Sequence, residues 1–375
     1  MLLLALRNLF RHKLRLLFSA GGVALALLLV LALDAIVEGV EKQLTAYIDN
    51  SQADIFVAQA GVRNLHMVSS TLPRQVVGEL QAIPGVAEVS PILYMTNMLD
   101  SGKERSQVYV IGLPAEATMG KPERIVEGAY LAKAQQVIID RAVASRLNLR
   151  PGDKVKILGK EFTIAGLTEN TTNIFNSIVF ISMEDFARLR GTPEVISFGL
   201  VRVRPPASPQ EVANQIEAKV AGVTALPREE FANQERKVVK DMAVDIINIM
   251  NLIGFLIGLA VVALTIYLAT LAHRSEYGVL KALGAGNRQL YRLVLDQALS
   301  SVGLGLALAV FFTLLLGLIV PQLGLNLALK LTGASVLKVT IMALVIAGMA
   351  ALLPIWQIGR LDPAQVFKQR GGGAS

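Results

Sequence analysis

Four long apolar stretches interrupt the chain, and their spacing is uneven. The first covers residues 16–33, and the other three cover residues 246–272, 297–329 and 339–359. A helix needs about 20 consecutive apolar residues to cross the hydrocarbon core of a bilayer, and only helices or closed barrels satisfy the backbone there. The pattern therefore predicts four membrane-spanning helices, with a large domain between the first and the second.

The segment between spans 1 and 2 alternates strand and helix patterns. Strands are predicted where apolar residues alternate, and helices where they recur every three or four positions. The predicted strands are residues 53–58, 86–93, 107–111, 136–139, 154–158, 161–167, 177–181 and 197–203, and the predicted helices are residues 73–82, 141–147, 183–189 and 209–220. The expected fold is an α-helical membrane protein with four transmembrane helices and a large α+β domain between spans 1 and 2.

The excess of basic residues lies in three short segments. Residues 1–15, 273–296 and 360–375 hold eleven of the 36 Lys and Arg residues but only three of the 29 Asp and Glu residues. Short loops rich in Lys and Arg stay in the cytoplasm. We therefore expect both termini and the 273–296 loop in the cytoplasm and the α+β domain outside it, and no nucleic-acid partner.

These assignments give the expected order of domains. Residues 1–15 form a basic amphipathic helix, an elbow at the membrane surface or simply a topology signal, and the first span is long enough to be an uncleaved anchor. The order is elbow 1–15, span 1 and stalk 16–50, extracytoplasmic α+β domain 51–228, stalk and span 2 229–272, cytoplasmic loop 273–296, span 3 297–321, external loop 322–338, span 4 339–359 and cytoplasmic tail 360–375.

Apolar residues continue beyond spans 1 and 2 with the spacing of packed helices. We expect two stalk helices packed together outside the membrane; two separate amphipathic helices against the α+β domain are the alternative. The predicted packing residues are Leu33, Val37, Val40, Leu44 and Tyr47 on the first helix and Val239, Met242, Ile246 and Ile249 on the second.

Few polar residues suggest a substrate-binding, catalytic or metal site. Gly254 and Gly258 form a GxxxG pair, which allows close helix packing, and Asp34 and Glu38 are candidate substrate contacts or simple boundary residues at the outer end of span 1. The chain has no cysteine, and its three histidines lie far apart. We therefore predict no catalytic, cofactor or metal site in this chain.

The 273–296 loop carries a short helix pattern with an exposed apolar patch. Glu276 lies near its start, where the helix dipole favours a carboxylate, and Gly284 is placed to end it. Tyr277, Leu280 and Leu283 recur on one side. An apolar patch in a water-facing loop needs a cover, either a partner protein or the bilayer surface.

The run RSEYGVLKALGAGNRQL in this loop resembles the coupling-helix motif Arg-x-x-Glu-x-Gly-x-x-x-Ala-Leu-Gly of MacB/FtsX-type ABC transporter permeases. His273 occupies the place of the motif's arginine, and Arg274 lies one place closer to Glu276. The similarity extends to the layout of spans and to residues 6–13, 137–167 and 361–364. The matching residues are Glu276, Gly278, Ala282, Leu283 and Gly284.

The resemblance implies that the loop docks on a cytoplasmic ABC ATPase. The chain has no Gly-x-x-x-x-Gly-Lys-[Ser/Thr] phosphate loop, so ATP and Mg would bind a separate ATPase subunit. The implied partners are two ATPase subunits, a second copy of this permease, membrane lipid, and a candidate periplasmic adaptor or outer-membrane protein. The expected ATPase-coupling residues are Arg274, Glu276, Tyr277, Gly278, Leu280, Lys281, Ala282, Leu283 and Gly284.

Three function classes follow, all in a bacterial cytoplasmic (inner) membrane. The first is export or extraction of a lipophilic cargo, such as a drug, lipid, lipoprotein or haem, by mechanotransmission. The second is an FtsX-like regulator that relays ATPase work to an external partner such as a cell-wall hydrolase. A membrane-anchored enzyme is the weakest of the three.

Two of the predicted spans lack charged residues. Residues 246–272 and 297–329 contain no charged side chain, whereas a polar substrate site at the bilayer midplane usually contains one.

Overall fold

The computed structural model describes residues 13–66, 68–131, 133–169, 171, 177–320 and 328–359. The chain divides into two compact units: residues 1–38, 243–320 and 329–375, here called the membrane unit, and residues 39–242 and 321–328, here called the sheet unit. The predicted tail and all but the last three residues of the predicted elbow lie outside the described residues.

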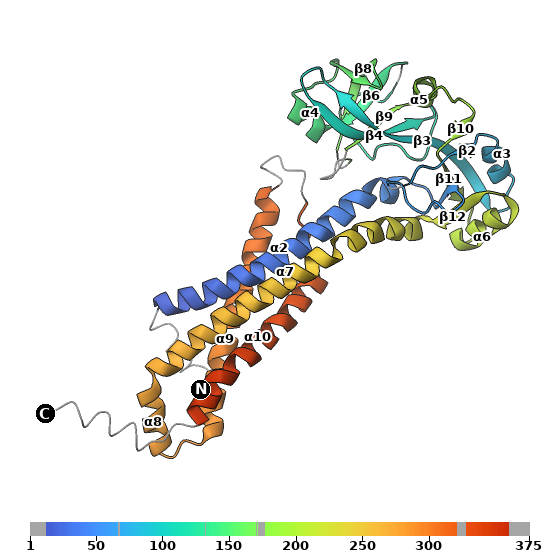
Figure 1. Ribbon diagram of the computed structural model, residues 1–375. Coiled ribbons are helices and arrows are strands. Elements are labelled where there is room, and N and C mark those ends of the chain that lie inside the picture. The colour runs from blue at the N-terminus through green and yellow to red at the C-terminus, as the bar shows by residue number, and fades with distance from the viewer. Residues whose placement is uncertain are drawn as a thin grey trace. The chain divides into compact units, whose positions relative to one another are not determined.

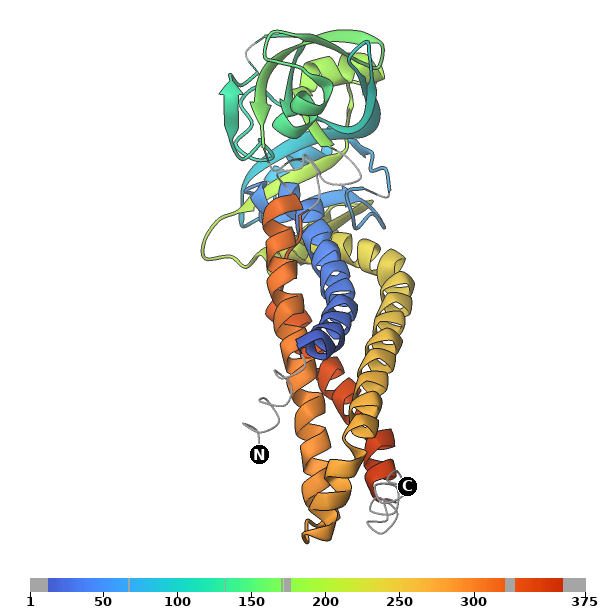
Figure 2. The same cartoon turned by 90° about the vertical axis from the view of Figure 1, so that its left-hand side faces the viewer.

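The membrane unit is built from long helices, as predicted. They are α2 (Lys13–Asn50), α7 (Arg228–Ala272), α9 (Asn287–Ile319) and α10 (Gly333–Gly359), with the short helix α8 (Arg274–Ala282) between α7 and α9 (Figure 1). Each long helix contains a segment that is long and apolar enough to cross a membrane. Figure 2 shows α9 and α10 from the side, and they pack extensively against each other. Helices α2 and α7 each continue from the membrane unit into the sheet unit.

Small residues allow these helices to approach closely. A Cβ on Gly254 of α7 would lie 2.5 Å from Cγ2 of Val30 on α2, and one on Gly258 would lie 3.0 Å from Cδ1 of Ile346 on α10. Without a hydrophobic force between helices in lipid, such close packing is a main source of their association. Within one chain, the GxxxG pair therefore lies against α2 and α10.

The sheet unit contains the α+β fold. Its strands are β1 (Ile55–Gln59), β2 (Leu72–Pro73), β3 (Val86–Asp100), β4 (Arg105–Leu113), β5 (Ile125–Gly128), β6 (Gln136–Asp140), β7 (Lys154–Ile157), β8 (Lys160–Thr168), β9 (Ser177–Ser182), β10 (Val195–Ile196), β11 (Phe198–Val203) and β12 (Val223–Pro227), and its helices are α3 (Val76–Gln81), α4 (Arg141–Leu147), α5 (Met183–Arg190) and α6 (Pro209–Lys219). The strand order of the main sheet is β12-β1-β11-β3-β4-β9-β6-β8-β5, with β7 pairing with β3 and β8.

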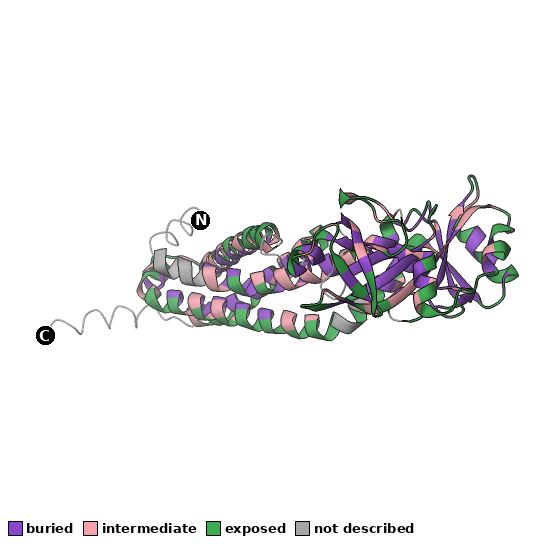
Figure 3. Cartoon of the chain, turned by 90° about the horizontal axis from the view of Figure 1, so that it is seen from above, coloured by how far each residue is buried: buried purple, intermediate pink, exposed green. Residues whose placement is uncertain are grey.

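Strand β3 joins the two halves of this sheet. Its first half pairs with β11 and its second half with β4 and β7. The half with β1, β11 and β12 packs on α3 and α6, and the half with β4, β6, β8 and β9 packs on α4 and α5. Figure 3 shows that buried residues are concentrated in the strands.

Most predicted elements are present with shifted ends, and α4 matches its predicted residues. The prediction is wrong for β3, which was expected to end at residue 93 but continues to Asp100, and it missed β5, β12 and the two-residue strands β2 and β10. The second half of β3 contains Asn97 and Asp100, which disfavour strands. Its pairing with both β4 and β7 compensates for this poor local preference.

Candidate functional site

Helix α8 forms the centre of the cytoplasmic loop predicted from the sequence. It begins two residues after α7 ends, and its last residue, Ala282, is followed by the C-cap Leu283 and by Gly284 with a φ of +93°. The amide of Ala285 donates to the carbonyl of Leu280 at 2.9 Å. Since only glycine adopts this backbone conformation without strain, Gly284 ends the helix as predicted and leads to α9.

The exposed side of α8 carries an apolar patch beside a carboxylate. Leu283 is 80% exposed and Leu280 is 41% exposed. The side chain of Glu276 is 63% exposed, and its Oε2 atom lies 3.1 Å from Nδ1 of His273. Arg274 and Ala282 are also exposed. This surface is suited to a protein partner that covers leucines and pairs with an acidic group.

Tyr277 departs from the expected anchoring role. Its side chain is buried in the apolar core of the membrane unit, together with Leu290 and Ile358, and the adjacent Gly278 is buried as well. Burial raises the pKa of Tyr277 to about 12, and the neighbouring Glu276 carboxylate adds to the shift. Tyr277 therefore holds α8 against the other helices, while Leu280 and Leu283 remain exposed.

Lys281 also contacts its own chain. Its Nζ atom donates to the carbonyl oxygens of Ile358 at 3.3 Å and Gly359 at 3.2 Å. These carbonyls belong to the last two described residues of α10. The resemblance implied a contact with the ATPase, whereas the structure shows a lysine that caps α10.

The candidate substrate contacts lie at the other end of α10. Both carboxylate oxygens of Asp34 on α2 accept from Nζ of Lys338 on α10, each at 3.1 Å. The side chain of Asp34 is 11% exposed, and Glu38 is half-buried. Asp34 is therefore occupied in an ion pair between two spans.

The stalk residues differ in their surroundings. Val40, Leu44 and Tyr47 of α2 are buried, and Leu33 and Val37 are half-buried. Ile246 and Ile249 of α7 are 56% and 55% exposed, so the structure does not place them in the packed seam that was predicted. The side chains of Val239 and Met242 lie outside the described residues.

Ion pairs connect α2 and α7 in the sheet unit. Arg236 lies 3.5 Å from Asp49, and Lys240 lies 3.3 Å from Glu41. The carboxylate of Glu41 is almost fully buried. The heptad spacing could not reveal these ion pairs, because charged residues do not contribute to a repeat of apolar positions.

Glu235 near the start of α7 is a buried polar residue that the sequence analysis missed. Its side chain is fully buried, and its two oxygens contact the amide of Leu65 and Nδ1 of His66, each at 2.6 Å. His66 packs against the rings of Tyr94 and Tyr109. This cluster fixes the segment after β1 onto the start of α7. The partners are about 170 residues apart, so no local pattern signals the pair.

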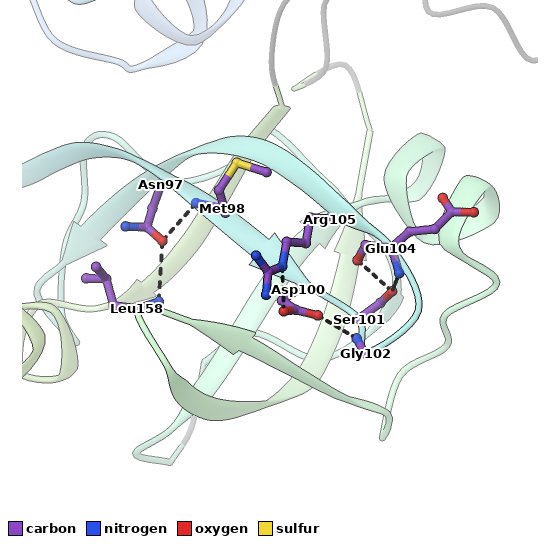
Figure 4. Close-up of polar contacts among 8 residues, drawn as sticks. All are labelled: Asn97, Met98, Asp100, Ser101, Gly102, Glu104, Arg105 and Leu158. Atoms are coloured by element: carbon purple, nitrogen blue, oxygen red, sulfur yellow. Dashed lines mark hydrogen bonds and ion pairs between the residues drawn. The ribbon is translucent and has the colours of Figure 1, made fainter.

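The turn between β3 and β4 is held by polar contacts (Figure 4). Oδ1 of Asp100 accepts from the amide of Gly102 at 2.7 Å, and Oδ2 accepts from Nε of Arg105 at 2.9 Å. The amide of Gly102 and the guanidinium of Arg105 hold the pKa of the Asp100 carboxyl below its usual range. Among the described residues, no group of three His, Asp or Glu side chains could hold a metal ion.

Comparisons with known proteins match this arrangement along the chain. Residues 16–219 match the MacB-like periplasmic core domain, and residues 248–363 match the FtsX-like permease C-terminal domain. The chain belongs to the MacB/FtsX-type ABC transporter permeases. It is thus a multi-pass membrane permease whose sheet unit is an extracytoplasmic domain.

Full-length relatives support the same assignment. An uncharacterized ABC transporter permease of Mycobacterium tuberculosis is 24% identical over 370 residues, which cover 98% of this permease and 99% of the relative. A relative named as a hemin transport system permease protein, HrtB, from Staphylococcus haemolyticus is 21% identical and covers 90% of this chain and 91% of its own. Because these relatives are themselves permeases of matching extent, ATP hydrolysis takes place on a separate subunit.

Two solved extracytoplasmic domains align with this permease. The extracellular domain of the noncanonic ABC-type transporter YknZ from Gram-positive bacteria covers 46% of this chain and 99% of its own, at 11% identity and a TM-score of 0.36. The periplasmic region of MacB from Actinobacillus actinomycetemcomitans covers 49% and 92%, at 12% identity and a TM-score of 0.37.

Proposed function

We propose that this permease couples a cytoplasmic ABC ATPase to movement of its extracytoplasmic domain, and thereby exports or extracts a lipophilic cargo. The observation that supports this proposal best is the exposed face of α8. Leu283 and Leu280 are 80% and 41% exposed on a helix that is otherwise fastened to the membrane unit by Tyr277 and Lys281. A helix held on one side and apolar on the other is suited to receive a push from a bound partner.

The proposed topology follows the charge pattern. Both termini and α8 face the cytoplasm, because the short segments there carry the basic excess. The complex contains two copies of this permease and two ATPase subunits, which bind ATP and Mg. Its location is the bacterial cytoplasmic membrane, and the sheet unit is available outside for an adaptor protein.

The cargo is proposed from the apolar character of the spans. Residues 246–272 and 297–329 have no charged side chain, which disfavours a polar translocation path through the bilayer. A drug, lipid, lipoprotein or haem could be taken instead from the outer leaflet or the external side. The HrtB relative is named for hemin transport, which places haem among the cargoes to test first.

A regulator that transports nothing is the second candidate. The ion pair between Asp34 and Lys338 occupies one of the two candidate substrate contacts at the outer end of span 1. This favours a permease that relays ATPase work to an external protein such as a cell-wall hydrolase. Stimulation of ATP hydrolysis by hemin or lipid in the reconstituted complex supports export, whereas stimulation by an external protein alone supports regulation.

The docking proposal is tested with Leu280→Asp combined with Leu283→Asp. We expect this variant to lose at least about tenfold in recovery of the ATPase from native membranes, because burying two carboxylates in an apolar contact is costly. The ATPase is identified by the peptide that contains its phosphate loop.

Leu158→Asp is the matched control, since Leu158 is 40% exposed in the sheet unit. Full recovery of an active ATPase with the double variant would contradict docking on α8.

A further inference from the structure

Helix α10 is held by polar contacts near both of its ends. At the cytoplasmic end, Lys281 of α8 donates to the carbonyls of Ile358 and Gly359, at 3.3 and 3.2 Å. A lysine near the C-terminal end of a helix interacts favourably with its carbonyls and with the negative end of the helix dipole. Ile358 is also buried with Tyr277 of α8 in one apolar cluster, so polar and apolar contacts both join α8 to α10.

At the outer end, Lys338 of α10 pairs with both oxygens of Asp34 on α2, each at 3.1 Å. The backbone reinforces this contact, because the amide of Lys330 donates to the carbonyl of Ala35 at 2.9 Å. The Asp34 side chain is 11% exposed. Removing Lys338 would leave a largely buried carboxylate without this partner, which is strongly unfavourable.

The two contacts are separated by the thickness of a membrane. Residues 338–359 of α10 form a helix of about 32 Å at 1.5 Å per residue, close to the roughly 30 Å of a hydrocarbon core. Between the contacts, α10 presents small residues to the interior, including the buried Ala343, Ala347 and Ala350. Pro354 also lies inside α10 between the two contacts and removes one backbone hydrogen bond of the helix. Transmission of displacement along α10 therefore depends on the close packing of these small residues.

The covalent connections of α8 show why the contacts of α10 with α8 and α2 matter for the movement of α2. Helix α7 follows directly into α8 through His273, so movement of α8 reaches α7 through the chain itself. Helix α2 has no such connection, since more than 200 residues separate it from α8. Yet α2 also leads into the sheet unit, because β1 begins five residues after α2 ends.

We propose that α10 is the relay that makes α2 move together with α7 when the ATPase displaces α8. Lys281 is its input contact and the Asp34–Lys338 pair is its output contact. Both are positioning contacts, and Lys281 acts within the permease rather than on the ATPase. This inference rests on the proposed docking of an ATPase on α8.

The test compares labels on the two stalk helices. Because the chain has no cysteine, Lys42→Cys on α2 and Lys237→Cys on α7, both exposed, each give a single site for a nitroxide. The permease is purified with its co-purifying ATPase, and the ATP-dependent change in the nitroxide spectrum is measured. In Lys281→Met we expect the change at residue 42 to fall about fivefold or more, with the change at residue 237 and recovery of the ATPase retained.

Two rescue variants distinguish a relay from general damage. Lys281→Arg keeps donors for the two carbonyls and should retain the response at residue 42. Asp34→Lys and Lys338→Asp should each lose that response, and the double exchange should restore it because the ion pair is rebuilt with its signs reversed.

Three results would overturn the relay. If both labels still respond in Lys281→Met, the ion pairs of Arg236 and Lys240 carry α2 along with α7. If both responses are lost while the ATPase is retained, the movements of α2 and α7 both depend on Lys281 and are not transmitted through separate contacts. If recovery of the ATPase is lost, Lys281 is a docking residue. Absence of any ATP response or ATPase in the parent complex would instead reject the proposed function.

Discussion

The large side chains of the sheet unit point inward, whereas many of those of the membrane unit point outward. Phe56, Phe180 and Phe186 are fully buried in the sheet unit, but Phe311 and Phe312 of α9 are 58% and 43% exposed. Figure 3 shows the same contrast, with buried strands and exposed helix faces. The sheet unit is stabilised by removal of apolar area from water, while helices facing lipid gain nothing from hiding such area and depend on close packing.

This contrast explains where polar contacts have consequences. In the sheet unit, the His66–Glu235 contact is buried, but pairs such as Lys154–Glu161 are largely exposed and contribute little to stability. In the membrane unit, the contacts of Lys281 and Asp34 lie near the two ends of α10 and connect it to α8 and α2. Under the proposed relay, these polar contacts determine which helices move together.

The largest expected effect compares buried with lipid-facing phenylalanines. Phe186→Ala should lower the free energy of unfolding of the sheet unit by about 3–5 kcal/mol, because it leaves a cavity in a packed core. Phe312→Ala should change stability by less than about 0.5 kcal/mol, since that ring faces outward.

Denaturant unfolding of the full chain in detergent, followed by circular dichroism, measures both phenylalanine variants. Similar losses for the two would show that α9 buries Phe312 against another helix.

A smaller effect is expected from adding one methyl group between helices. Gly254→Ala places a Cβ 2.5 Å from Val30, and such overpacking costs about 1–3 kcal/mol. Gly348→Ala is the control, because its Cβ would meet no atom within 4 Å. Melting temperatures in detergent should fall for the first variant and remain near the parent value for the second. Equal melting temperatures for the two variants would show that close packing at Gly254 does not hold the helices together.

The smallest effect concerns the exposed β3–β4 turn. The contacts of Asp100 lower its pKa, so its carboxylate stabilises the folded turn above the pKa of the unfolded chain, and this stabilisation is lost as pH falls through the lower folded pKa. A fluorophore on Lys103→Cys should show lower anisotropy in Asp100→Asn than in the parent at pH 7, and the difference should vanish in acid.

Glu104→Gln should leave the anisotropy unchanged, because Glu104 joins the turn through its backbone atoms. A pH-independent difference between Asp100→Asn and the parent would mean that the carboxylate charge is not what orders the turn.

The sequence predicted the architecture because the dominant signals are local. Runs of apolar residues identify the four spans, alternation identifies most strands, and Gly284 identifies the end of α8. The motif around Glu276 identified the family. Each of these signals lies within a short window, so it does not depend on how distant segments meet.

The contacts of individual residues could not be predicted in the same way. Periodicity places Tyr277 on an apolar face with Leu280 and Leu283, but it does not distinguish a core contact from a docking surface. Lys281 and Asp34 have partners 77 and 304 residues away. The heptad spacing at Ile246 and Ile249 describes an apolar face without saying what covers it.

The buried contact between Glu235 and His66 has a consequence for the length of α7. One residue inserted into a helix rotates everything beyond it by about 100°. Since Glu235 is fixed in orientation near one end of this 45-residue helix, a single insertion between Glu235 and Ala272 would turn the following loop to a different side. Insertions of seven residues, close to two full turns, would nearly restore the phase. Natural variation in the length of this segment should therefore occur in steps of whole turns.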